Sequence, residues 1–169
     1  MIEMGRNPGV LEIYEAVVEW ADDDLINDPN IIVVVGGDGT FLESVHLNGP
    51  DKTYIPINAG HLGFLLNDVW TPADEHEDGH IYPTEGKRIR DRNWMVREFP
   101  VIEAQFADGT KEYAINDVFM ERASGQTARI SVKVDGSCLV SKMVCDGVIV
   151  STSLGSTGYN FSAGGPVVH

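Results

Sequence analysis

The sequence has few cysteines and lacks the long apolar segments that are typical of secreted and membrane proteins. Its 169 residues include two cysteines, Cys138 and Cys145, with neither a CxxC spacing nor a disulfide framework. It has no secretory signal and no apolar run near the length that spans a bilayer. We therefore expect a cytoplasmic protein without a membrane partner. Because each cysteine lies in or beside an apolar strand-like run, we expect two buried free thiols.

Positive charge is also scarce. Lys and Arg number 12 against 26 Asp and Glu, which gives a formal net charge of −14. No basic stripe can neutralise phosphates along a nucleic acid, so a nucleic-acid partner is disfavoured. The acid excess would slow the approach of an anionic nucleotide, and a divalent cation is expected to accompany it. His76 and His80 lie in a charged stretch without a coherent four-ligand set, so no metal ligands are assigned to the chain.

The stretch 31–40, IIVVVGGDGT, is the first that indicates chemistry. Its five β-branched residues predict a buried strand of a parallel sheet, and its glycines allow a tight turn close to a ligand. A helix is predicted over 40–47, with Phe41, Leu42 and Val45 on one face. Strand, glycine loop and helix start form an anion site. Asp38 would repel an anion, so it must hold a metal, accept a ligand hydroxyl or take a proton from a nucleophile.

The order of elements predicts an α/β unit over residues 1–67. The segment 8–25 reads as an amphipathic helix with Leu11, Tyr14, Val17 and Val18 on one face, and a short strand is expected near 53–57. Strands alternating with helices favour a parallel, Rossmann-like sheet. The loop at 36–40 is neither a P-loop, because no GxxxxGK[ST] is present, nor the GxGxxG dinucleotide fingerprint.

The remainder, residues 68–169, is predicted to be a β-rich domain. Residues 68–93 are polar and irregular, and we place the domain boundary there. Alternating segments flank two hairpin signals, Asp108-Gly109 and Asp135-Gly136. The block 146–166 holds a short buried strand at 148–150, then small and hydroxyl residues that can bond ribose or phosphate oxygens. A simple Gly/Ser-rich turn is the alternative interpretation of that block.

Two nucleotide-suited loops in one chain indicate two phosphate-bearing ligands, or one long dinucleotide. With a lone carboxylate at one loop, they favour phosphoryl transfer onto a hydroxyl. The chain here resembles the NAD kinase family in four blocks: GGDGT at 36–40, INAGHLGFL at 57–65, Asn116-Asp117-Val118, and DGVIVSTSLGSTGYNFSAGGP at 146–166. GGDGT is shared with lipid kinases of the diacylglycerol type, whereas the second and fourth blocks are more specific to NAD kinases.

The resemblance implies phosphorylation of NAD to NADP by ATP or polyphosphate, with Mg²⁺ carried on ATP. Asp38 would orient and deprotonate the 2′-hydroxyl of the adenosine ribose. The substrate-binding residues implied by the family are Asp38, Gly39, Phe64, Asn116, Asp117, Asp146, Thr157, Gly158, Tyr159, Asn160, Phe161 and Ser162. The implied fold is the α/β N-terminal unit of NAD and diacylglycerol kinases, followed by a β-rich C-terminal domain.

Each of these roles has a structural alternative. Asp38 could be a turn residue, Phe64 a core residue, and Asn116-Asp117 a hairpin corner. The sequence also departs from the family pattern, with Ser153-Leu154 in place of Pro-Thr, Gly158 in place of Ala, and Val144 in place of a basic residue.

The match to the family also looks incomplete at both ends. Family members continue beyond His169, and we expect the strand before the first helix to be missing from this sequence. Exposed strand edges would favour a homo-oligomer. A nucleotide-binding module without catalysis and, less favoured, a lipid kinase are the alternative functions.

Overall fold

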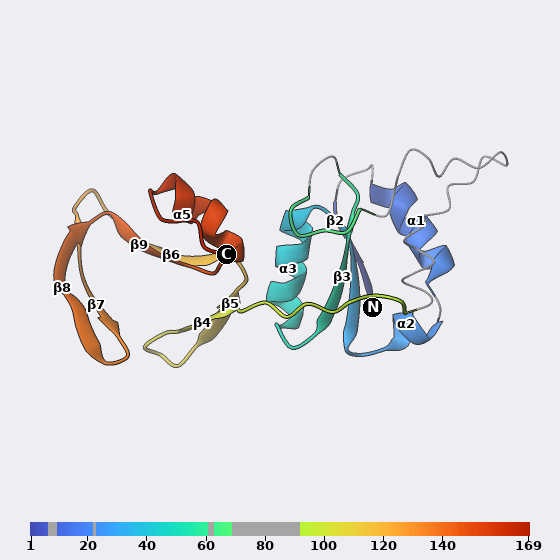
Figure 1. Cartoon of the computed structure of the whole chain (residues 1–169), viewed down its shortest axis with the longest axis horizontal. Coiled ribbons are helices and arrows are strands. Elements are labelled where there is room, and N and C mark those ends of the chain that lie inside the picture. The colour runs from blue at the N-terminus through green and yellow to red at the C-terminus, as the bar shows by residue number, and fades with distance from the viewer. Residues whose placement is uncertain (7–9, 22, 61–62, 69–91) are drawn as a thin grey trace. The chain divides into compact units, whose positions relative to one another are not determined.

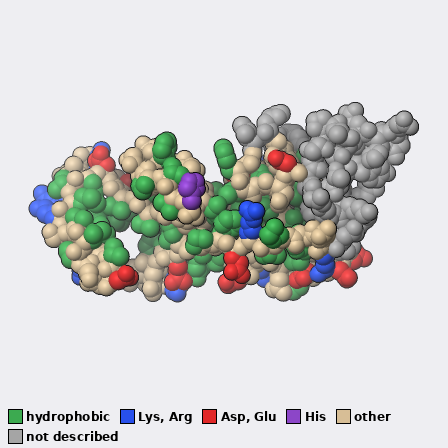
Figure 2. Space-filling model, viewed as in Figure 1, with side chains coloured by type: hydrophobic (Ala, Val, Ile, Leu, Met, Phe, Trp, Pro, Cys, Tyr) green, Lys and Arg blue, Asp and Glu red, His purple; other side chains and the backbone are tan. Residues whose placement is uncertain are grey.

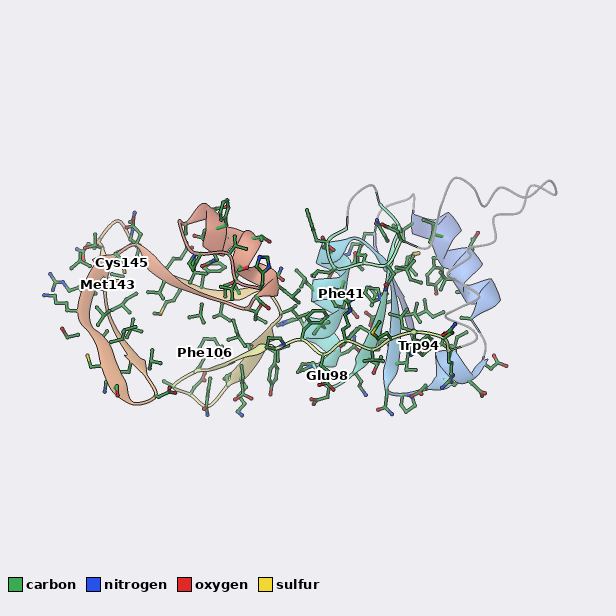
Figure 3. The ribbon with its side chains drawn as sticks, in the orientation of Figure 1. Phe41, Trp94, Glu98, Phe106, Met143 and Cys145 are labelled. Atoms are coloured by element: carbon green, nitrogen blue, oxygen red, sulfur yellow. The ribbon has the colours of Figure 1, made fainter. Side chains whose placement is uncertain are left out.

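The computed structural model describes residues 1–6, 10–21, 23–60, 63–68 and 92–169. It divides into two compact units, Met1–Glu98 and Phe99–His169. The domain boundary was expected within residues 68–93, most of which lie outside the described residues. The division falls later in the chain because Trp94 packs against the core of the first unit (Figure 3).

The first unit is a parallel three-stranded sheet in the order β1-β2-β3. Its helices cover both faces of the sheet (Figure 1). The predicted α/β unit is confirmed, with β2 and β3 and the helix after β2 close to their expected positions. The strands are β1 (Ile2–Met4), β2 (Ile31–Gly36) and β3 (Thr53–Asn58), and the helices are α1 (Val10–Trp20), α2 (Asp23–Asn27) and α3 (Asp38–Asn48).

The strand β2 is buried along its whole length because both of its faces are covered. Val33 and Val35 belong to the core that includes Leu25 of α2. Strand residues alternate between faces, so Ile32 and Val34 point to the opposite side, where α3 packs on β2. An uninterrupted run of β-branched residues is what such a strand requires.

Two expectations for the start of the chain were wrong. The strand that we expected to be missing before the first helix is present as β1, which pairs with β2 through Ile2 and Val33. Three residues are too few to show a periodicity, so the pattern could not reveal it. The predicted helix 8–25 is divided into α1 and α2, and Leu11 and Val18 are half exposed. Of the predicted face, Val17 is buried and Tyr14 packs against the core, and Val10, seven positions before Val17, completes the buried stripe.

The second unit consists of three separate two-stranded antiparallel sheets. The pairs are β4 (Ile102–Gln105) with β5 (Lys111–Ala114), β6 (Asp117–Glu121) with β9 (Gly147–Ser151), and β7 (Ala128–Val134) with β8 (Ser137–Cys145). A 3₁₀ turn, η2 (Leu154–Thr157), and the short helix α5 (Tyr159–Ser162) follow. The β-rich prediction and both Asp-Gly hairpins are confirmed, and Gly109 and Gly136 have positive φ angles of 90° and 79°.

The described residues of the second unit include no buried apolar side chain, since every buried apolar residue lies in the first unit. Figure 2 shows hydrophobic side chains at the surface of the second unit. The expected burial of the cysteines was therefore wrong. Cys138 is exposed, and Cys145, at the end of β8 (Figure 3), is half-buried. Val150 of the expected buried strand is likewise 55% exposed. Two-stranded ribbons without a covering layer cannot bury their side chains.

Candidate functional site

The first candidate site lies where β2 and β3 end. Gly36 and Asn58 are the last pair of the parallel ladder, and the N–H of Ala59 then donates to the Gly36 carbonyl at 3.0 Å. The carboxyl ends of parallel strands are where α/β proteins bind ligands. The chain therefore brings its first two motif blocks, 36–40 and 57–65, to one edge of the sheet.

The glycines of the 36–40 loop differ in what surrounds them. A Cβ on Gly36 would lie 2.6 Å from the Thr40 hydroxyl oxygen, so Gly36 is required by packing against that side chain. A Cβ on Gly37 or Gly39 would meet no atom within 4 Å. Packing thus explains Gly36 and Thr40, whereas the backbone at Gly37 and Gly39 is open to a ligand.

Asp38 begins α3, immediately after its N-cap, Gly37. Its Oδ2 accepts a hydrogen bond from the backbone N–H of Phe64 at 3.0 Å, and its Oδ1 accepts one from Leu65 at 3.0 Å. The first-turn N–H groups of α3 and the helix dipole favour negative charge at this point. The carboxylate is therefore fixed in orientation beside an open, glycine-lined helix start.

Phe64 is not a core residue, because its side chain is 88% exposed. The loop that contributes its amide to Asp38 thus leaves a large aromatic ring in solvent next to the carboxylate. Exposed aromatic rings are a common means of contacting a ligand ring. The ring and the Asp38 carboxylate together suit a ligand that carries both a hydroxyl and an aromatic group.

Asn58 and Asp68 form a pair for which the sequence predicted no role. The side-chain amide of Asn58 donates to Asp68 Oδ1 at 2.7 Å, and its Oδ1 accepts from the N–H of Gly60 at 2.9 Å. The sequence did offer a signal at Asn58, because it is a polar residue at the end of the buried strand β3, much as Asp38 follows the end of β2. The hydrogen bond between Asn58 and Asp68, however, could not be predicted from the sequence.

The second unit joins the other two motif blocks through the β6–β9 ladder. The carbonyl of Asn116 accepts hydrogen bonds from the N–H of Thr152 at 2.9 Å and the hydroxyl of Ser151 at 3.2 Å. Gly155 packs so closely on the backbone of Asn116 that a Cβ there would collide with the Asn116 carbonyl. These bonds use the Asn116 backbone and leave its side-chain amide outside them. Asp117 begins β6 opposite Ser151 and is half-buried.

Asp146 and Tyr159 line one small depression of about 90 Å³ in the second unit. Tyr159 contacts Phe119 edge-on, with ring centroids 5.5 Å apart. Asp146 also forms an ion pair with Arg122 at 2.6 Å, a partner that the sequence analysis missed. Arg122 follows β6 and Asp146 precedes β9, and they come together because these two strands pair, which the sequence alone could not predict.

The turn at 157–162 contains residues that bond its own backbone and residues that are only exposed to solvent. The Asn160 amide donates to the carbonyls of Ser156 at 3.1 Å and Pro166 at 2.8 Å, and the Ser162 hydroxyl donates to Gly158 at 3.2 Å. Phe161 is 60% exposed, and Thr157 and Gly158 are also exposed. These side-chain bonds to backbone carbonyls give Asn160 and Ser162 a structural role in this turn, although Ser162 itself is exposed.

Several pKa values are perturbed in the supporting strands. Burial raises the pKa of Tyr54 to about 12, with a further contribution from the negative charge of Glu3. Hydrogen bonds from Lys111 and Tyr113 lower the pKa of the Glu103 carboxyl, and the same contact raises that of Lys111. Across the β4–β5 turn, hydrogen bonds from Thr110 lower the pKa of Asp108.

No three His, Cys, Asp or Glu side chains come together to hold a metal among the residues that the structure describes. Within the same ranges, no helix is both long and apolar enough to cross a membrane.

Comparison with known proteins gives two family-model matches. Residues 10–75 match the ATP-NAD kinase N-terminal domain, and residues 115–169 match the ATP-NAD kinase C-terminal domain. Each match contains two of the four motif blocks.

Curated relatives and solved structures agree with these matches. The NAD kinase of Brucella suis biovar 1 is 37% identical over 94% of this chain, and that of Caulobacter vibrioides is 36% identical over 95%. The chain spans only 58% and 59% of the length of these two relatives.

The NAD kinase from Archaeoglobus fulgidus, solved in complex with ATP, is 29% identical with a TM-score of 0.70, over 99% of this chain and 66% of that one. Yeast NADH kinase, complexed with NADH, has the same fold at 21% identity and a TM-score of 0.71, over 99% of this chain and 62% of that one. With both domain models matched in order, the chain belongs to the NAD kinase family.

Proposed function

We propose that this chain transfers the γ-phosphoryl group of ATP to the 2′-hydroxyl of the adenosine ribose of NAD, giving NADP and ADP. The observation that carries the proposal is the Asp38 carboxylate, held by two backbone amides beside the open glycines at the start of α3. Phosphoryl transfer needs positioning and charge stabilisation more than covalent chemistry, and this arrangement supplies both.

In the proposed reaction, Asp38 accepts the proton of the 2′-hydroxyl as that oxygen bonds to the γ-phosphorus. The bond between the γ-phosphorus and the β–γ bridging oxygen breaks, and ADP leaves. The Mg²⁺ ion would arrive on the phosphates of ATP and neutralise their charge, which matters for a chain of net charge −14. Polyphosphate is the alternative donor, because its terminal phosphoryl group presents the same chemistry.

The remaining roles come from the family resemblance. Gly39 would contact the dinucleotide through its open backbone, and Phe64 would line the pocket with its exposed ring. In the second unit, the Asn116 side chain and Asp117 would bind ribose and adenine groups, and Asp146 the nicotinamide end. Tyr159 would pack on a ring, with the dinucleotide running along Thr157, Gly158, Asn160, Phe161 and Ser162.

We further propose a cytoplasmic homo-oligomer without a membrane or nucleic-acid partner. The support for association is the exposed apolar surface of the second unit, which includes Phe119 at 54% and Leu139 at 69% exposure. Side chains of this kind mark interaction surfaces when they cluster. Sedimentation of the purified chain tests this directly, and a monomer at every concentration would contradict it.

The test of the kinase is NADP formation by the purified 169-residue chain with NAD, ATP and Mg²⁺. Asp38→Asn should lower kcat by about 10²- to 10⁴-fold, the usual contribution of a general base, while NAD affinity changes little. Asp51→Asn, at an exposed position before β3, is the matched control. Near-normal turnover by the Asp38 variant would remove the assigned role.

A second candidate function is NAD binding without catalysis. Its support is the second unit, whose described residues form three separate two-stranded sheets and include no buried apolar side chain. Calorimetric binding of NAD without detectable NADP formation would favour this function. The lipid-kinase alternative would require turnover of a diacylglycerol or sphingoid substrate in place of NAD.

A further inference from the structure

The loop that holds the Asp38 carboxylate is itself held by a side-chain pair at the end of β3. Asn58 is nearly buried, at 9% exposure, and uses both ends of its side-chain amide. Its nitrogen donates to Asp68 at 2.7 Å, after the loop, and its oxygen accepts from the N–H of Gly60 at 2.9 Å, before it. One side chain therefore ties together the two sides of the loop.

The backbone of the same loop is fixed by Asn67. The N–H of Asn58 donates to the Asn67 carbonyl at 2.9 Å, and the N–H of Asn67 donates to the Pro56 carbonyl at 2.9 Å, which makes a short parallel bridge between Ile57 and Asn67. The Asn67 side chain also donates to the Pro56 carbonyl at 2.9 Å. The returning chain is thus aligned with β3 immediately after the residues that bond Asp38.

Phe64 and Leu65 lie only a few positions before this bridge. Their amides reach Asp38 at 3.0 Å, so a small displacement of the loop would lengthen both hydrogen bonds. Bonds of this kind weaken steeply with distance and angle, and misplacement by about 1 Å can reduce a catalytic rate by about 10²-fold. The hydrogen bond between the Asn58 and Asp68 side chains fixes the position of the loop just after Phe64 and Leu65, together with the bonds of Asn67.

We infer that Asn58, through its hydrogen bond to Asp68, is a positioning residue that fixes the orientation of the Asp38 carboxylate. The inference rests on the proposed kinase function, because the orientation matters only if Asp38 takes the proton from the acceptor hydroxyl. Asn58 itself touches no reacting atom in this scheme. It acts through the 63–68 segment, whose amides hold the carboxylate.

Three variants separate this role from simple stabilisation. Asp68→Ala removes the acceptor at an exposed position, so the fold should survive. Asn58→Asp places two carboxylates against each other while keeping an acceptor for the N–H of Gly60. The double variant N58D/D68N exchanges the two groups and restores a donor–acceptor pair, and Asp51→Ala is the control.

The first measurement is the ¹H–¹⁵N spectrum, which needs no activity. The amide signals of Phe64 and Leu65 should move when Asp38→Ala removes their acceptor. Asp68→Ala and Asn58→Asp should move the same signals in the same direction, and the double variant should return them. Unmoved signals in both single variants would overturn the inference, whether or not the chain is a kinase.

The second measurement is steady-state NADP formation. Each single variant should lower kcat by about 10- to 100-fold with an unchanged KM for ATP, and the double variant should recover to within about threefold of wild type. If the amide signals move but kcat does not, the pair is only structural and the inference fails. If the wild-type chain makes no NADP while the amide signals respond as expected, the proposed function fails and the hydrogen-bond coupling stands.

Discussion

The Asp38 carboxylate and the backbone N–H of Phe64 meet across 26 positions of sequence, with N–O distances of 3.0 and 3.2 Å to the two carboxylate oxygens. The contact joins the loops that follow two neighbouring parallel strands. It also separates two functions within one residue, since the Phe64 amide holds the carboxylate while its side chain lies in solvent. A substitution of the Phe64 side chain can therefore leave Asp38 in place.

Phe64→Ala should reduce NAD affinity without destabilising the fold. Its ring is 88% exposed, so the free energy of unfolding should change by no more than about 0.5 kcal/mol. Loss of the stacking surface should raise the KM for NAD by about tenfold and leave the KM for ATP unchanged. Thermal unfolding and initial-rate kinetics on one preparation check both parts. A large fall in the melting temperature with unchanged kinetics would identify Phe64 as a core residue after all.

The sequence predicted those features that depend on neighbouring residues. Five β-branched residues marked β2, and the two Asp-Gly pairs marked the hairpins, because strand burial and turn geometry are set locally. The motif blocks also singled out Asp38 and Phe64, whose roles at the site stay predictions. What they could not supply was the contact between these residues, since a hydrogen bond from a loop amide depends on the backbone path and not on the side chain.

Other features depended on the tertiary environment. The stripe of α1 was predicted correctly at Tyr14 and Val17 but not at Leu11 and Val18, because apolar residues in that helix fit more than one face and only packing on the sheet selects among them. The burial of Cys138 was wrong because an alternating strand buries a face only if another layer covers it. The Asn58–Asp68 and Arg122–Asp146 pairs were missed for the same reason, as no periodicity brings those positions together.

Gly36 and Gly37 should respond differently to substitution by alanine. Gly37 has φ −102°, and a Cβ there would meet no atom within 4 Å, so Gly37→Ala should change stability by no more than about 1 kcal/mol, because the entropy gain in the unfolded chain is offset by the poorer N-cap that alanine makes. It should nonetheless reduce NADP formation, because the methyl group would fill space open to the ligand. Gly36→Ala would push against Thr40 and should lower stability by about 1–3 kcal/mol. Equal stability losses in the two variants would show that the loop is closed at both positions.

Tyr54 should make the first unit sensitive to alkaline pH. Its hydroxyl donates to the Gly49 carbonyl at 2.6 Å, and burial raises its pKa to about 12 against about 10 in the unfolded chain. The folded state therefore holds this proton more tightly, so stability is complete below pH 10 and falls as pH rises towards 12. Tyr54→Phe should cost about 1 kcal/mol at neutral pH and abolish that decline.

Tryptophan fluorescence can follow this effect. The three tryptophans of the sequence all lie before residue 99, and Trp94 packs against the core of the first unit, so the change in emission during urea unfolding reports on the loss of that packing. Wild type and Tyr54→Phe should differ in pH dependence between pH 10 and 12 and run parallel below it. Identical slopes for the two proteins over that interval would contradict the assignment.

Gly155→Ala should disturb the second unit at the point where its two motif blocks meet. A Cβ at this position would collide with the Asn116 carbonyl, which is backbone and cannot move aside as a flexible side chain can. We expect stability to fall by about 1–3 kcal/mol, because one added methyl must displace the β6–β9 ladder.

Hydrogen exchange at the Thr152 amide, which donates to that carbonyl at 2.9 Å, measures the effect locally. Gly125→Ala, where a Cβ would meet no atom within 4 Å, is the matched control and should leave the Thr152 amide protected. If the Thr152 amide exchanges at the wild-type rate in both variants, Gly155 and the Asn116 carbonyl are not in close contact and the prediction is wrong. NAD binding should weaken in Gly155→Ala only, since the Asn116 backbone then no longer holds its side-chain amide in place.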